Sequence, residues 1–176
     1  MRAPSPFVAA LDRAPFLTMV AIGTGEILEV ARCRVYSMTA LERNLTDFAR
    51  DYGADTLVVE PGSTLGVLGA AHRYRVVRLS LSLAKRTLLP DDATPTHARL
   101  YEHLLTRYPS LRRYSTANRV EGHQDPWARW RNEKLLAVAL GLAARYRSLH
   151  AHDRTVDAPQ PVASPPPHPH IVPSFH

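Results

Sequence analysis

Cysteine is nearly absent from this sequence, and long apolar runs are absent altogether. A single cysteine, Cys33, among 176 residues excludes an internal disulfide framework and a zinc site built on several cysteines. No stretch of about 18 residues is continuously apolar, so we expect no membrane-spanning helix. The first residues also lack the apolar core of a secretory signal. These features together lead us to expect the protein in the reducing cytoplasm.

Length and composition predict one globular domain followed by a tail. The 176 residues are 45% apolar and 22% charged, which is typical of one soluble domain with its own core. Seven prolines lie between residues 158 and 176, and a segment of this kind buries too little surface to offset its ordering entropy. We therefore expect a domain over residues 1–151 and a disordered, Pro- and His-rich tail over residues 152–176.

Positive charge is concentrated in the middle of the chain. The formal charge is −2 over residues 1–70, +9 over residues 71–150 and −1 over residues 151–176. Such a positive segment on a nearly neutral remainder indicates a polyanion such as nucleic acid as the partner, because each neutralised phosphate releases counterions. The alternative is that these arginines form an ordinary solvated surface.

Hydrophobic patterning predicts an α/β fold with one mixed five-stranded sheet flanked by helices. Three apolar runs with short connections predict successive antiparallel strands, and the later strands alternate with helices, as parallel strands do. Thr39 is the expected N-cap of the first helix, with Glu42 completing a capping box, and Gly53 is expected to end that helix. The predicted strands are residues 7–11, 16–22, 27–36, 56–60 and 74–81, and the predicted helices are residues 39–53, 61–71, 96–107 and 126–149.

Two acidic residues end predicted strands. Asp12 follows the first apolar run, and Glu60 follows the fourth. If those two strands are parallel neighbours, both carboxylates emerge at the carboxyl edge of the sheet, where open α/β sheets place their sites. Asp12 can also simply cap a turn. A carboxylate beside a buried strand, as at Glu60, is costly to desolvate unless another group compensates it.

This element order, with acids at these places, resembles the ribonuclease H-like superfamily and, within it, the RuvC-type Holliday-junction resolvases. Residues 8–12 and the strand at 18–22 look like the family's first metal-binding acid and hairpin, and residues 57–60 look like its second acid. The turn Arg13-Ala14-Pro15 departs from the family, which usually has a small turn such as Pro-Gly there.

The likeness continues into the second half of the chain. Residues 83–89 resemble the segment in which the family carries a basic catalytic-site lysine, here Lys85, and His97 falls near a second basic position. Residues 135–140 resemble the family's closing helix, which carries the remaining acids in its first turns. The acidic spacing of that helix is not reproduced literally here.

The resemblance implies a metal-dependent, structure-selective DNA endonuclease that resolves Holliday junctions. Hydrolysis of a phosphodiester needs charge neutralisation on the phosphoryl oxygens and an activated water, which two Mg²⁺ or Mn²⁺ ions held by carboxylates supply. Asp12 would bridge the ions, Glu60 would hold one of them, and Lys85 would be a basic catalytic residue. The implied partners are branched or four-way DNA and a second copy of the chain, in DNA recombination or repair.

The third acidic ligand is either Asp125 or Glu133. They are eight residues apart, about 12 Å along a helix, so we do not expect both to bind the same ion pair. The expected sheet-facing arc of the last helix consists of Leu135, Val138, Ala139, Leu142, Tyr146 and Leu149. It places Asp125 at its edge and Glu133 well outside it, and Asp125-Pro126 is a strong helix start. We favour Asp125 and keep Glu133 as the alternative. His123 could be a further ligand or a base that orients water.

Basic residues around the fifth predicted strand and in the loops after it would contact the DNA backbone without reading its sequence. Trp127 and Trp130, flanked by arginines, could stack on splayed bases or belong to the core. The predicted nucleic-acid-binding residues are Arg73, Arg75, Arg78, Lys85, Arg86, Arg112, Arg113 and Arg119.

Three other functions stay open. A nuclease of the same fold could act on RNA instead of DNA. A catalytically inactive nucleic-acid-binding protein of the same fold is kept open by the unusual turn after Asp12 and by the ambiguous third acid. A protein whose basic face contacts an acidic protein is the least favoured, and a steep salt dependence of DNA affinity would argue against it.

Overall fold

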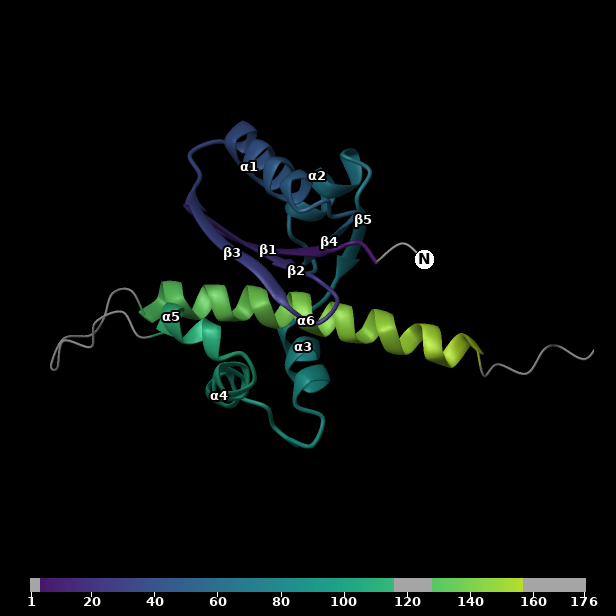
Figure 1. Ribbon diagram of the computed structural model, residues 1–176. Helices are drawn as coiled ribbons and strands as arrows, with labels where there is room; N and C mark the ends of the chain where they lie inside the picture. The colour runs from purple at the N-terminus through teal and green to yellow at the C-terminus, as the bar shows by residue number, and fades with distance from the viewer. Residues whose placement is uncertain (1–3, 116–127, 157–176) are drawn as a thin grey trace, which may run out of the picture.

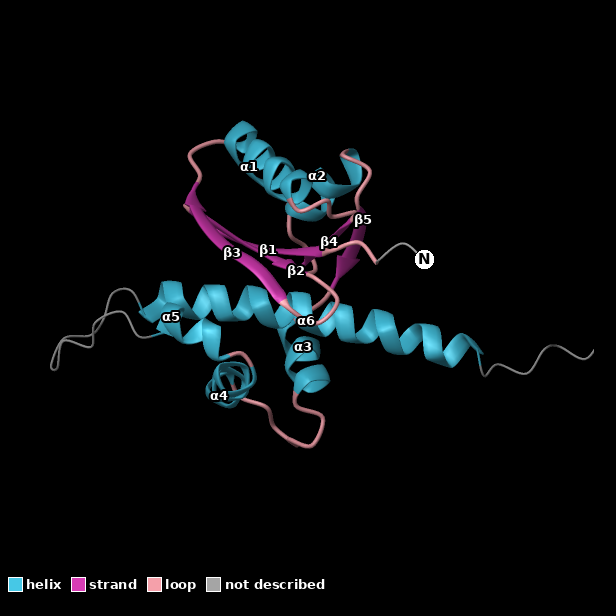
Figure 2. Cartoon of the chain, viewed as in Figure 1, coloured by secondary structure: helices cyan, strands magenta, loops and turns pink. Residues whose placement is uncertain are grey.

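The computed structural model describes residues 4–115 and 128–156 of the chain. Its centre is one five-stranded sheet with the strand order β3-β2-β1-β4-β5. Helices cover both faces of this sheet (Figure 2). The strands are β1 (Phe7–Arg13), β2 (Phe16–Ile22), β3 (Ile27–Arg34), β4 (Thr56–Val59) and β5 (Arg75–Arg78). The helices are α1 (Met38–Asp51), α2 (Leu65–Ala71), α3 (Leu81–Leu88), α4 (His97–Arg107), a 3₁₀ turn (Pro109–Leu111), α5 (Arg112–Ser115) and α6 (Ala128–Val156).

The sheet is mixed, as the patterning predicts. β1 pairs antiparallel with β2, and β2 pairs antiparallel with β3, because connections this short allow only hairpins. β1 pairs in parallel with β4, and β4 pairs in parallel with β5, each after a helical crossover. The α/β class and the mixed five-stranded sheet flanked by helices are therefore confirmed.

Strand β1 is the centre of the fold and is buried on both faces. Its odd-numbered residues, such as Ala9 and Leu11, belong to the core beneath α6, and its even-numbered residues, such as Val8 and Ala10, belong to the core beneath α1 and α2. We call these two sides of the sheet the α6 face and the α1 face (Figure 1). Successive side chains of a strand point to opposite faces, so this assignment also applies to the residues that end the strand.

The N-cap of the first helix lies two residues earlier than expected. Ser37, not Thr39, is the N-cap of α1, because the Ser37 hydroxyl accepts a hydrogen bond from the Ala40 backbone N–H at 3.1 Å. The capping box expected from Thr39 and Glu42 is therefore wrong. Gly53 follows the helix with a φ of 61°, a left-handed conformation that favours glycine and ends the helix as expected.

The segment after β5 contains a helix, α3, that patterning did not reveal. The fifth strand, predicted over residues 74–81, ends at Arg78, and Ser80 caps α3 by accepting a hydrogen bond from the Leu83 N–H at 3.2 Å. A serine cap overrides the β-branched composition that favours a longer strand. The 3₁₀ turn and α5 were likewise not predicted.

The last helix is longer than predicted and is the main cover of the α6 face. It ends at Val156, beyond the expected helix end at 149 and the expected domain end at 151, while residues 116–127 and 157–176 lie outside the described residues. Tyr146 and Leu149, placed on the sheet-facing arc by the helical wheel, are 49% and 44% exposed because the helix there extends past the sheet. None of the helices in the described part of the chain is long and apolar enough to cross a bilayer.

Gly141 allows α6 to lie directly against the sheet. A Cβ at this position would lie 2.6 Å from Ile22 Cγ1 and 3.2 Å from Ala9 Cβ, both of which are buried in β2 and β1. Such distances leave no space for a methyl group, so the absence of a side chain sets the separation between helix and sheet.

We expect Gly141→Ala to lower the free energy of unfolding by about 1–3 kcal/mol, since overpacking outweighs the helix propensity that alanine adds. Urea unfolding followed by circular dichroism measures this change. Gly25→Ala is the matched control, because a Cβ at Gly25 would meet nothing within 4 Å. A Gly141→Ala protein as stable as the parent would show that α6 does not pack closely at this point.

Candidate functional site at the carboxyl edge of the sheet

Asp12 and Glu60 lie at the same edge of the sheet. β1 and β4 are parallel neighbours with Ala9 opposite Val58, so both strands end at the carboxyl edge of the sheet (Figure 1). The expectation that these strands are adjacent and parallel is therefore confirmed. This edge is the one at which open α/β sheets place their sites.

The pleat directs the two carboxylates to opposite faces. Asp12 continues the even-numbered series of β1 and so belongs to the α1 face, where its row neighbour Leu17 is also buried. Glu60 comes two residues after Val58, which faces α6, and so belongs to the α6 face. Sharing an edge therefore does not bring the two carboxylates to the same side of the sheet.

Arg13 binds Glu60. Arg13 continues the odd-numbered series of β1 on the α6 face, and its Nη2 donates to Glu60 Oε2 in an ion pair. Its Nη1 donates to the backbone carbonyl of Asp12 at 3.2 Å. The side chains of Arg13 and Glu60 are 37% and 21% exposed, so the pair is open to solvent. Arg13 thus compensates the carboxylate of Glu60. It is also the first residue of the turn that departs from the resolvase pattern.

Glu133 is buried against the sheet, contrary to the position expected from the helical wheel. It is 7% exposed, and its Oε2 accepts a hydrogen bond from Nη2 of Arg32 on β3 at 3.1 Å. A carboxylate leaves water only when a cation replaces its hydration, and Arg32 supplies that cation. The helical wheel predicted the wrong environment for Glu133 because it uses only the apolar residues of the helix and takes no account of a charged partner on a strand.

The described carboxylates do not fit a two-metal site. Residues 4–115 and 128–156 contain no group of three or more His, Cys, Asp or Glu side chains that could hold a metal ion. Glu60 and Glu133 are both engaged by guanidinium groups, whereas the carboxylate of Asp12 has no hydrogen bond or ion pair to a described residue. Asp125 and His123 lie outside the described residues, so the metal ligand set that includes them stays a prediction.

A row of aromatic rings and guanidinium groups crosses the α6 face beside Arg13. The guanidinium carbon of Arg32 lies 3.7 Å from the ring centre of Phe16. Arg34 lies between two rings, 5.8 Å from the centre of Phe16 and 5.3 Å from that of Tyr36. Tyr36 is 79% exposed. We call Phe16, Arg34 and Tyr36 the stacking row.

Two further cations, Lys134 and Arg113, lie on the helical side of Arg32. Burial lowers the pKa of Lys134, as do the positive charges of Arg32 and Arg113, while Glu29 acts in the opposite direction. Arg32 and Arg113 therefore both lie within electrostatic range of Lys134, in the amino-terminal part of α6. Arg34 has no carboxylate partner among the described residues. The edge therefore carries exposed aromatic and basic groups together.

Sequence reasoning missed the stacking row because it placed the basic face in the second half of the chain. The signal was nevertheless present: Arg32 and Arg34 alternate along β3 and therefore share a face, and Tyr36 follows at the same spacing. Arginines that alternate on a strand next to aromatic residues were read only as charges between apolar positions.

The predicted DNA-contacting residues do not form one surface. Arg73 and Arg75 lie at the amino end of β5, and Arg78 lies at its carboxyl end, where its Nη2 approaches Gly66 of α2 on the α1 face. Arg86 and the half-buried Lys85 are on α3. Arg112 and Arg113 are exposed on α5, whereas Arg119, Trp127 and the side chain of Trp130 are not described.

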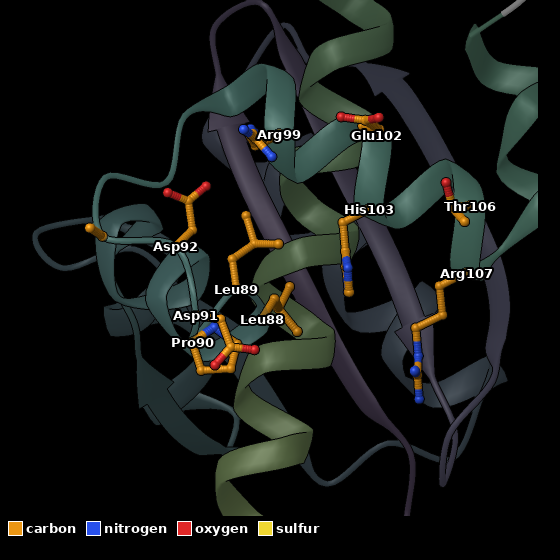
Figure 3. A pocket seen from close by; sticks show the side chains of 11 residues that line it. Leu88, Leu89, Pro90, Asp91, Asp92, Arg99, Glu102, His103, Thr106 and Arg107 are labelled. Atoms are coloured by element: carbon orange, nitrogen blue, oxygen red, sulfur yellow. The ribbon is translucent and has the colours of Figure 1, made fainter.

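A wide pocket lies apart from this edge, between the α3–α4 loop and α4. Figure 3 shows Arg99, Glu102 and His103 on α4 facing the loop that carries Asp91 and Asp92. Its volume is about 870 Å³. Acidic and basic side chains both line it, so it offers no net positive surface to a phosphate backbone, and we assign it no role in the site.

We expect Arg32→Met to lower the free energy of unfolding by about 3–5 kcal/mol, because it removes the guanidinium that compensates the buried Glu133 carboxylate. Thermal and urea unfolding measure the loss. The double variant Arg32→Met/Glu133→Leu is expected to recover most of it, since two apolar groups replace two charges.

Arg50→Met is the control for Arg32→Met. It breaks the Arg50–Asp47 pair on α1, whose side chains are 72% and 46% exposed. We expect a cost below about 1 kcal/mol there. Equal costs for the two single variants would contradict a stabilising role for the buried pair.

Comparison with known proteins adds no family to this description. The chain matches no protein-family model, and no curated protein matches it in sequence. Its function is therefore inferred from its own residues and their geometry: a mixed sheet whose carboxyl edge carries two acids on opposite faces and, on one of those faces, a row of arginines and aromatic rings.

Proposed function

We propose that this protein binds nucleic acid at the carboxyl edge of a ribonuclease H-like sheet. The observation that carries the proposal is the stacking row, in which Arg34 lies between Phe16 and the exposed ring of Tyr36 without a carboxylate partner among the described residues. An arginine in this setting can bind a phosphate, and an exposed ring beside it can stack on a base.

The strand order supports the ribonuclease H-like part of the proposal. The resemblance implies three antiparallel strands followed by parallel strands that alternate with helices, and the order β3-β2-β1-β4-β5 has this form. The acids that the resemblance aligns, Asp12 and Glu60, end neighbouring parallel strands. Fold alone does not establish activity, so the site has to carry the functional argument.

The charge distribution supports a polyanionic ligand. The positive charges of Arg32 and Arg113 both act on Lys134 and, after burial, lower its pKa. Each phosphate neutralised by such a surface releases counterions, which gives affinity without sequence specificity. Aromatic stacking accepts any base, so the site suits unpaired or splayed nucleotides of the kind found at a branch point.

The first candidate is the non-catalytic form of this function. Glu60 is bound by Arg13, and Glu133 is bound by Arg32, so both carboxylates on the α6 face already have a cation. Asp12 belongs to the other face. The guanidinium of Arg13 also repels a divalent cation at the position where Glu60 would hold it. Binding of nucleic acid by the stacking row requires no metal.

The second candidate is a metal-dependent, structure-selective DNA endonuclease of the Holliday-junction resolvase type. One observation favours it: Asp12 and Glu60 end adjacent parallel strands, and the pairing of Arg13 with Glu60 is open to solvent. Solvent-exposed pairs are weak, so a divalent cation could displace Arg13. In this candidate, Lys85 is a basic catalytic residue, Asp125 is a metal ligand, and a homodimer cuts DNA junctions. A nuclease of the same kind that cuts RNA is a variant of it.

We expect Arg34→Ala/Tyr36→Ala to weaken binding of a labelled four-way DNA junction about tenfold or more, because stacking on one base contributes about 1–3 kcal/mol. Fluorescence anisotropy at several salt concentrations measures the affinity. The slope of log affinity against log salt concentration should become shallower by about the equivalent of one phosphate contact, since one cation is removed.

Arg50→Ala is the matched control for the binding experiment. It also removes one exposed arginine, but from α1 on the other side of the sheet, and should leave affinity within about twofold if only the local surface matters. If the double variant and the control lost the same DNA affinity, the stacking row would not be the binding site.

Cleavage assays separate the two candidates. Junction, duplex and RNA substrates are incubated with the wild-type protein in Mg²⁺ or Mn²⁺, and we expect intact substrates. Cleavage that is lost in both Asp12→Asn and Glu60→Gln would instead establish the endonuclease, and the preferred substrate would say whether it acts on DNA junctions or RNA. Retained DNA binding in both variants checks that they are folded.

A further inference from the structure

A second positively charged site lies at the opposite edge of the sheet. Phe7, Thr56 and Arg75 are the first residues of β1, β4 and β5, and they lie in one row across the three parallel strands. A pocket of about 390 Å³ opens at this amino edge. Its lining comprises Pro4, Ser5, Phe7, Asp55, Thr56, Arg73, Arg75, Arg145 and Ser148.

Arg145 of α6 is the unusual residue of this pocket. It is 5% exposed, and Nη1 donates to the Ser5 carbonyl at 3.1 Å, while Nε and Nη2 are buried without a hydrogen-bond partner among the described residues. Its guanidinium carbon lies 4.6 Å from the ring centre of Phe7, which compensates the charge only partly. A buried cation normally has a counter-charge, because desolvation of an unpaired ion is costly.

No described carboxylate supplies that counter-charge. Arg73, Arg75 and Arg145 form no ion pair within residues 4–115 and 128–156. Asp55 also lines the pocket, but it forms no ion pair with these arginines, and its Oδ1 accepts a hydrogen bond from the Thr56 hydroxyl at 2.8 Å. Water can satisfy N–H groups but cannot neutralise the charge. Three guanidinium groups therefore line one pocket with a single acid.

We propose that this pocket binds a phosphate monoester. A terminal phosphate carries up to two negative charges and three free oxygens, which suit several guanidinium forks, whereas a phosphodiester offers one charge and two free oxygens. Arg75 and Arg145 meet the phosphate from the α6 face, since Arg75 shares the strand parity of Val77 in that core. The remaining volume accommodates part of the group that the phosphate esterifies. The site is independent of the proposed function at the other edge.

Isothermal titration calorimetry with inorganic phosphate, at constant ionic strength set by chloride, tests the proposal. We expect saturable binding by the wild-type protein and affinity about tenfold or more lower in Arg73→Gln/Arg75→Gln, because two charged hydrogen-bond donors are removed. Both arginines are exposed, so this variant should keep its fold. Absence of saturable binding to wild type, or equal affinity in the variant, would overturn the proposal.

Arg50→Gln/Arg43→Gln is the matched control, because it removes the same charge from α1. Its phosphate affinity should equal that of the wild type, and a loss equal to that of the pocket variant would show a general charge effect and overturn the site. Arg145→Met provides a separate readout. We expect it to abolish the rise in Tm that phosphate causes without lowering the Tm of the free protein, because methionine keeps an apolar contact for Phe7 and removes a buried charge that has no carboxylate partner among the described residues.

Two further titrations identify the source of the phosphate. A nucleoside 5′-monophosphate is compared with a single-stranded oligonucleotide that carries either a 5′-phosphate or a 5′-hydroxyl. Tighter binding of the 5′-phosphorylated oligonucleotide, lost in Arg73→Gln/Arg75→Gln, identifies a nucleic-acid end. Equal binding of the monophosphate and inorganic phosphate identifies a small phosphorylated ligand. Equal oligonucleotide affinity with and without the terminal phosphate, and in wild type and variant, would contradict the proposed phosphate site. It would leave the proposed role of the stacking row unchanged.

Discussion

Burial of β1 on both faces is the constraint on which the rest of this structure depends. Every residue of this strand up to Leu11 lies in one of two cores, so the strand cannot rotate or shift by one residue without exposing one apolar set to water. The alternation of side chains between the two faces continues to the end of the strand. Asp12 therefore belongs to the α1 face and Arg13 to the α6 face, where it binds Glu60.

Arginine compensates buried or half-buried charge at each important point of the α6 face. Arg13 holds Glu60, and Arg32 holds Glu133 and stacks on Phe16. Both arginines belong to the first third of the chain, whose net charge is slightly negative. Glu60 and Glu133, two of the candidate metal ligands, are thus neutralised by arginines from a segment with no net positive charge. The cations left without an acid partner, such as Arg34, are the ones available to a ligand.

The parallel strands separate two regions of positive charge. One lies at their carboxyl edge, around the stacking row, and the other lies at their amino edge, around Arg145. α6 reaches both regions, because it runs along the α6 face (Figure 1) and carries Lys134 near Arg32 and Arg145 against Phe7. Gly141, between them, keeps this helix in contact with β1 and β2. The helix that covers the core therefore also supplies a cation to each proposed site.

Local patterning determined the strands, the parallel and antiparallel pairing, and the edge at which Asp12 and Glu60 lie, because hydrophobic periodicity and short connections are properties of neighbouring residues. It missed α3 and misplaced the cap of α1, where one serine hydroxyl outweighs propensity. Only the tertiary structure decided which polar groups meet: Arg32 is 101 residues from Glu133, and Arg145 is 140 residues from the Ser5 carbonyl that it binds. Such pairs depend on packing between distant segments, which no local pattern encodes.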